Sequence, residues 1–74
     1  MSTFPSLTGK RLVRILRKFG FEIARIKGSH HFLMHEDGRC TVVPVHGNET
    51  IGSGLLVRIL RDADLTKEEL QKKL

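Results

Sequence analysis

Apolar residues recur every three or four positions near the start of the chain, a spacing typical of one face of an α-helix. These positions are Leu12, Ile15, Leu16 and Phe19. Thr8 is well placed as the N-cap of this helix, and Leu7 can pack on Leu12 inside it. Gly20 supplies a C-terminal stop. The pattern predicts a first helix between Thr8 and Gly20.

A second helical stripe lies in the C-terminal third of the chain and ends at Asp64. Its apolar residues are Leu55, Leu56, Ile59, Leu60 and Ala63. Directly after it, Thr66 and Glu69 have the spacing of a capping box, in which each side chain accepts a hydrogen bond from the other residue's backbone N–H. This spacing predicts a short third helix that runs toward Leu74.

Three short runs between the helical stripes have the alternation and the flanking turn residues of β-strands. The predicted strands are Phe21 to Lys27, His30 to His35 and Arg39 to Val43. Gly28-Ser29 and Asp37-Gly38 supply the turns between them. The sequence therefore predicts a meander of three antiparallel strands.

The second predicted strand has two different faces. Phe32 and Met34 share the face of His30, whereas Leu33 lies between His31 and His35. We expect the Phe32 face to be the buried one. That expectation puts His30 at the inner rim of the sheet and places His31 and His35 on its open side.

The predicted order is α-β-β-β-α, followed by a short terminal helix. A three-stranded antiparallel sheet with two helices on one face buries both helical stripes in two layers. We therefore expect an α+β two-layer sandwich formed by a single domain, residues 1–74. A chain of 74 residues has room for only one small hydrophobic core.

The formal net charge of the chain is +5, a high positive density for its size. The polar face of the first predicted helix contributes five cations and no anion: Lys10, Arg11, Arg14, Arg17 and Lys18. Such a surface attracts nucleic acid or an acidic partner. A run of charges can also be no more than a solvated face.

Cys40 is the only cysteine, so the chain can form no internal disulfide, which fits a reducing cytoplasm. Its position in a predicted strand indicates a small core residue. No apolar run approaches the ~18 residues of a membrane span. These features predict a cytoplasmic location.

The segment Lys27-Gly28-Ser29-His30-His31 combines residues suited to acid–base chemistry at a tight turn. Histidine can both accept and donate a proton near neutral pH, and Lys27 can stabilise developing negative charge. The segment also fits an ordinary hairpin turn with incidental histidines. A metal site at His31, His35 and His46 is disfavoured, because no carboxylate or thiol lies at ligand spacing.

Five segments occur together in an order and spacing that cover nearly the whole chain. They are Leu7-Thr8-Gly9-Lys10, Gly20-Phe21, Lys27-Gly28-Ser29-His30-His31, Val43-Pro44-Val45-His46-Gly47 and the helix from Gly54-Leu55 to Leu65-Thr66. In this ordered set the chain resembles the HicA toxin family of toxin–antitoxin systems.

The resemblance implies a double-stranded-RNA-binding-domain-like fold, an mRNA-cleaving ribonuclease activity and silencing by a HicB antitoxin. The family's catalytic histidine belongs to its Gly-Ser-His motif, which maps here to His30, with His31 as the second candidate. No cofactor is implied. Asp64 departs from the family pattern, which usually has a glycine at this helix end.

RNA carries its own nucleophile, the 2′-hydroxyl beside each phosphodiester. Cleavage needs a base for the attacking hydroxyl, a cation for the charge on phosphorus and an acid for the leaving oxygen, and needs no metal in principle. We expect His30 to act as general acid or base. The residues expected to bind RNA are Lys10, Arg14, Arg17, Lys27 and Ser29.

Two alternatives stay open at this point. A non-catalytic module of this fold would bind duplex RNA through shape and phosphate contacts. The lysine cluster that such modules usually carry at the start of the last long helix is replaced here by Gly52-Ser53-Gly54-Leu55. A protein-binding domain would need an exposed apolar patch, and the sequence predicts none with certainty.

Overall fold

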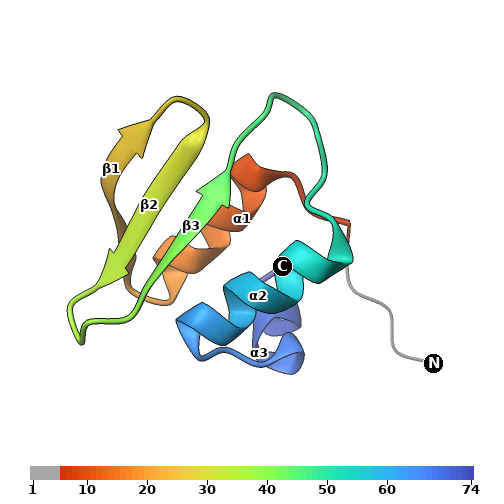
Figure 1. Cartoon of the computed structure of the whole chain (residues 1–74). Coiled ribbons are helices and arrows are strands. Elements are labelled where there is room, and N and C mark those ends of the chain that lie inside the picture. Colours follow the sequence, from red (N-terminus) through yellow and green to blue (C-terminus); the bar gives the residue numbers. More distant parts are fainter. Residues whose placement is uncertain (1–5) are drawn as a thin grey trace.

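The computed structural model describes residues 6–74, so the first five residues of the predicted domain lie outside the described residues. The elements are α1 (Gly9–Lys18), β1 (Phe21–Lys27), β2 (His30–His35), β3 (Cys40–Pro44), α2 (Ser53–Ala63) and α3 (Lys67–Lys72). Figure 1 shows their order along the chain. It confirms the predicted α+β class and the α-β-β-β-α order with a short C-terminal helix.

The three strands form one antiparallel sheet in the order β1-β2-β3. Lys27, His30 and Pro44 form one cross-strand row at the end of the sheet next to the β1–β2 turn. That turn contains Gly28, whose φ of 59° lies in the left-handed region that favours glycine. A shift of register at Ala24 places a β-bulge in β1.

The face of β2 that packs into the core carries Leu33, which is 1% exposed, whereas Met34 on the opposite face is 51% exposed. The expectation that the Phe32 face is buried is therefore wrong. Its physical reason is the register. The buried Phe21 pairs with His35, so these two side chains lie on the same face of the sheet as Leu33.

The positions expected for the histidines of β2 are reversed as a consequence. His31 and His35 lie on the helix side of the sheet, and His30 lies on the open side. Cys40, which we expected in the core, is exposed on the open side, while its neighbour Thr41 is buried. The alternation of side chains along β2 is as predicted, but the buried and exposed faces are exchanged.

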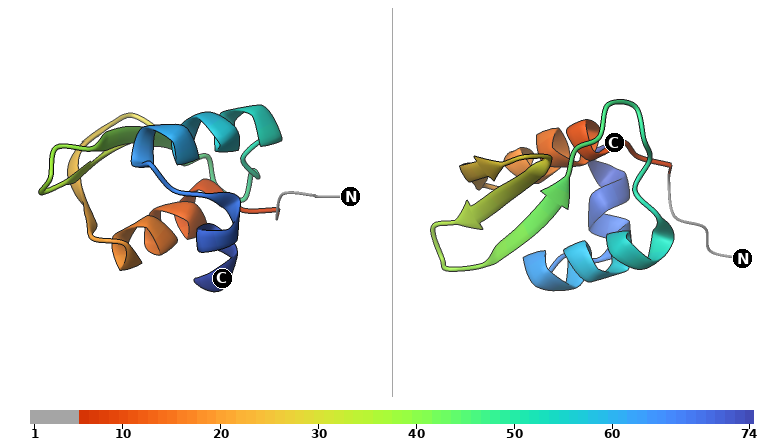
Figure 2. Two further views of the ribbon diagram at one scale, coloured as in Figure 1. Left: turned by 90° about the horizontal axis from the view of Figure 1, so that it is seen from below. Right: turned by 45° about the horizontal axis from the view of Figure 1, so that its top comes forward.

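The helices lie on the inner side of the sheet and along one edge. α1 crosses the inner face, α2 runs beside β3, and α3 folds back beneath α2 (Figure 1 and Figure 2). Thr8 caps α1 as predicted, because its Oγ1 accepts a hydrogen bond of 3.2 Å from the backbone N–H of Arg11. A Cβ on Gly9 would collide with the carbonyl oxygen of Pro44. Glycine therefore lets the first turn of α1 pack against the end of β3.

One hydrophobic core joins these layers. Its buried members are Leu7, Leu12, Val13, Ile15, Leu16, Phe21, Leu33, Val43, Leu56, Ile59, Leu60, Ala63 and Leu70. Thr41 Oγ1 donates a 3.1 Å hydrogen bond to Asp62 Oδ2 and so joins β3 to α2. The capping box predicted for Thr66 and Glu69 is present at the start of α3. Within residues 6–74, no helix is long and apolar enough to cross a membrane.

Candidate functional site

The β1–β2 turn sends two adjacent histidines to opposite faces of the sheet. His30 and His31 open β2 directly after Gly28-Ser29, and alternation along the strand separates their side chains. The carbonyl oxygen of Ser29 accepts a 2.7 Å hydrogen bond from the backbone N–H of Val45. This bond holds the turn against the loop that follows β3, so the backbone at both histidines is fixed.

His31 is half-buried on the helix side of the sheet. Its Nδ1 lies 3.4 Å from the carbonyl oxygen of Ser29, which can accept a hydrogen bond from a protonated Nδ1. In that tautomer Nε2 carries the lone pair and can take a proton from a substrate. In this tautomer, the contact with Ser29 leaves the lone pair of Nε2 available to a substrate.

Three cations of α1 share a shallow pocket with His31. The pocket has a volume of about 260 Å³, and Lys10, Arg14 and Arg17 line it together with His31 and three apolar side chains. All three cations are exposed. In the described part of the chain, none of them forms a salt bridge with a carboxylate. They are available to an anionic ligand such as a phosphodiester.

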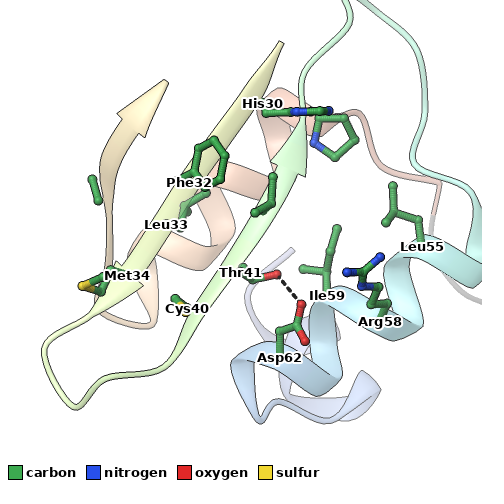
Figure 3. A pocket seen from close by; sticks show the side chains of 13 residues that line it. His30, Phe32, Leu33, Met34, Cys40, Thr41, Leu55, Arg58, Ile59 and Asp62 are labelled. Carbon is green, nitrogen blue, oxygen red and sulfur yellow. Dashed lines mark hydrogen bonds between the residues drawn. The ribbon is translucent and has the colours of Figure 1, made fainter. Parts of the chain in front are cut away.

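His30 lies on the opposite side of the sheet and is exposed. Its cross-strand partner in β1 is Lys27. It lines a groove between the open face of the sheet and α2 (Figure 3). The groove has a volume of about 680 Å³. The predicted site residues therefore form two groups, one around His31 on α1 and one around His30 and Lys27.

His35 has a structural environment. Its ring contacts the Phe21 ring edge-on, with centroids 5.3 Å apart, and its Nδ1 lies 3.2 Å from Asp37 Oδ1. The pKa of the Asp37 carboxyl is lowered, chiefly because the carboxyl accepts a hydrogen bond from the backbone N–H of Arg39. The guanidinium of Arg39 lowers this pKa further, and His35 makes a smaller contribution. This cluster closes the β2–β3 turn.

In the described part of the chain, His31, His35 and His46 are not gathered into one metal site. His46 is exposed in the loop after β3, whereas His35 pairs with Phe21 of β1. Among residues 6–74, no three histidine, cysteine or acidic side chains gather as a potential metal site.

Arg25 is a residue that the sequence did not indicate. Its guanidinium carbon lies 5.3 Å from the centroid of the Phe32 ring, over the ring face. The two residues are cross-strand neighbours only because the bulge at Ala24 shifts the register. In the sequence, Arg25 is only a basic residue in a predicted strand. Nothing there distinguishes it from an arginine that is simply solvated.

Comparison with known proteins gives a family. A family model described as the HicA toxin of bacterial toxin–antitoxin matches residues 9–65. The chain belongs to the HicA toxin family. A search of curated proteins found no match.

Membership makes this HicA protein the toxin component of a toxin–antitoxin system and implies an antitoxin partner. The matched residues begin with α1 and end just after α2. They include both histidines of the turn and the cations of α1, whereas α3 lies outside them. The resemblance seen in the sequence is thus confirmed at the level of the family.

Proposed function

We propose that this HicA toxin is an endoribonuclease that cleaves mRNA and so arrests translation in the cytoplasm. The observation that carries the proposal is the grouping of one half-buried histidine, His31, with three unpaired cations of α1 in a single shallow pocket. A proton acceptor beside several phosphate-binding groups is what phosphodiester cleavage requires.

Of the two candidate histidines, the geometry favours His31, the second candidate of the sequence motif. Three features support this preference: His31 shares a pocket with Lys10 and Arg14, its ring is oriented by Ser29, and His30 faces away on the open side. Ser29, expected to contact RNA, contributes here through its backbone carbonyl.

The proposed reaction begins when Nε2 of His31 removes a proton from the attacking hydroxyl, either the 2′-hydroxyl of the RNA or a water. Negative charge then accumulates on the non-bridging oxygens of the phosphate, and the α1 cations stabilise that charge where it develops. The leaving 5′-oxygen takes a proton from His31 or from solvent. These steps use only side chains of the chain and need no metal.

The test is cleavage of a single-stranded RNA by the purified protein in EDTA, followed on a denaturing gel. We expect the wild type to cleave and His31→Ala to be at least about 100-fold slower, the usual contribution of a general base. RNA that is bound but never cleaved by the wild type would contradict the proposal. It would favour the non-catalytic RNA-binding module, which the basic surface of α1 also suits.

The proposed partner is an antitoxin of the HicB type that covers the His31 pocket. The three cations around the pocket favour an acidic contact surface on the antitoxin. Purified toxin–antitoxin complex should cleave RNA much more slowly than free toxin. An equal rate would refute control by occlusion of this pocket.

A further inference from the structure

The open side of the sheet forms a groove that the proposed cleavage chemistry does not use. Strands β2 and β3 supply the floor, including Phe32 and Val42, and α2 supplies one wall, including Leu55 and Arg58 (Figure 3). The groove has a volume of about 680 Å³, which lies in the range of small-ligand sites. His30 lies at its end nearest the β1–β2 turn.

Two large apolar side chains are exposed on this face. Met34 is 51% exposed and Val42 is 37% exposed, although the open side of an antiparallel sheet ordinarily carries polar residues. The one carboxylate on the wall, Asp62, already accepts the hydrogen bond of Thr41. An apolar strip of this kind on an exposed face is typical of a binding surface.

A cationic platform formed by Arg25 and Phe32 adjoins the strip. The guanidinium carbon of Arg25 lies over the ring of Phe32, 5.3 Å from its centroid, so a cation and an aromatic ring are paired beside the groove. Unpaired nucleobases stack on aromatic rings and on arginine guanidinium planes. A hydrophobic peptide would gain less from a guanidinium held over a ring, so the platform favours a base over a protein segment.

The charges around the groove suit a nucleotide as well. Lys27 pairs with His30 at one end of the face, and Arg58 lines the α2 wall. Glu22, which pairs with Met34, lies at the far end of the same face. Lys27 at the β1–β2 turn and Arg58 on the α2 wall are therefore the cations that the phosphates flanking a bound base can reach.

We propose that the open face binds an unpaired nucleobase of RNA on the Arg25–Phe32 platform, with the neighbouring phosphates toward Lys27 and Arg58. This rests on the proposed function, in which RNA is the substrate. One strand of RNA then passes around the β1–β2 turn, with a base on the open face and a phosphodiester at His31. Only single-stranded RNA can do this, because a paired base has no free face for the platform.

The test compares two hexamers built on 2′-deoxyribose, which lack the 2′-hydroxyl and are not cleaved through it. One carries six thymines, and the other has the same backbone without bases. Dissociation constants come from fluorescence anisotropy. We expect the wild type to bind the base-containing hexamer about tenfold more tightly, the usual effect of stacking one base. Equal affinities would overturn the proposal.

Variants locate the effect. Phe32→Leu keeps an apolar side chain at this half-buried position but removes the aromatic face, and Arg25→Gln changes an exposed residue whose loss does not threaten folding. Each should reduce the preference for bases by about 3- to 10-fold, and Phe32→Leu, which removes no charge, should leave binding of the abasic backbone unchanged. Met34→Leu on the same face is the matched control and should behave as wild type. Wild-type preference in Arg25→Gln and in folded Phe32→Leu would overturn the proposal.

Amide chemical shifts distinguish a bound nucleobase from a second copy of the protein on this face. Thymidine monophosphate should shift the resonances of Phe32 and Val42. If those resonances shift only with the concentration of the protein itself, the face binds a second copy and the proposal is wrong. Failure of RNA cleavage with the base preference intact would refute the proposed function alone, so the two failures are distinguishable.

Discussion

Replacing Arg14 and Arg17 with alanine tests whether the α1 surface binds the phosphates of RNA. Both side chains are exposed and line the His31 pocket, so their replacement by alanine opens no cavity in the core. Alanine also has the highest helix propensity, so α1 should persist in the double variant. Circular dichroism and thermal melting should therefore match the wild type closely.

The magnitude follows from counterion release. Each phosphate contact with single-stranded RNA contributes about −0.7 to the slope of log K against log salt concentration. If both arginines contact phosphates, the slope should become shallower by about 1.4. Between 50 and 200 mM salt, the wild type should then lose about sevenfold more affinity than the variant does.

The assay is anisotropy with an oligonucleotide methylated at every 2′ oxygen, which presents the RNA backbone without a free nucleophile. The matched control replaces Arg11 and Lys18, which lie on the same helix outside the pocket. The control removes the same charge but should keep most of the wild-type slope. An unchanged slope in the Arg14 and Arg17 variant, or an equal change in both, would refute a phosphate site at this pocket.

Three further predictions concern stability. Leu33→Ala should reduce the free energy of unfolding in urea by about 2–5 kcal/mol and Met34→Ala by less than about 1 kcal/mol, because only Leu33 is buried; the reverse order would contradict the assigned faces. Asp64→Gly should raise it by about 0.5–1 kcal/mol, because Asp64 ends α2 at a φ of 56°, and a loss of stability would show that the aspartate side chain is needed there. The pKa of Asp37 is lowered in the folded state, so its contribution to stability is present above the unfolded pKa and is lost as the pH falls through the folded value. Asp37→Asn should therefore flatten acid unfolding below about pH 4, and an unchanged acid limb would refute the role of this carboxylate.

Local signals in the sequence predicted the elements well. The Thr8 cap, the capping box of Thr66 with Glu69 and the two helical stripes each depend on residues within one or two turns of each other. Such patterns carry their own physical cause, so the structure follows them. The glycine at the β1–β2 turn is of the same kind.

The buried face of β2 could not be predicted in this way. One face of the strand offers Phe32 and Met34 beside His30, and the other offers Leu33 between His31 and His35. The choice between them depends on the register with β1, a non-local property. The bulge at Ala24 and the cover that Arg25 gives to Phe32 complete that choice. Neither feature can be recognised from the residues of β2 alone.

The candidate site was predicted in part for the same reason. The sequence indicated the two histidines and the cations of α1, but its spacing could not show which histidine shares a pocket with those cations. That depends on how α1 crosses the sheet. The side-chain directions of His30 and His31 are opposite, as alternation requires, and only the tertiary packing assigns each direction to a face.

The central claim is that His31 carries the proton in RNA cleavage, and chemical rescue tests it most directly. Single-turnover cleavage rates are measured for wild type, His31→Ala and the neighbouring control His30→Ala, each with and without added imidazole. We predict that His31→Ala is at least about 100-fold slower and regains activity with imidazole, while His30→Ala stays within about tenfold of the wild type. A folded His31→Ala protein that cleaves normally, beside an inactive His30→Ala protein, would contradict the account.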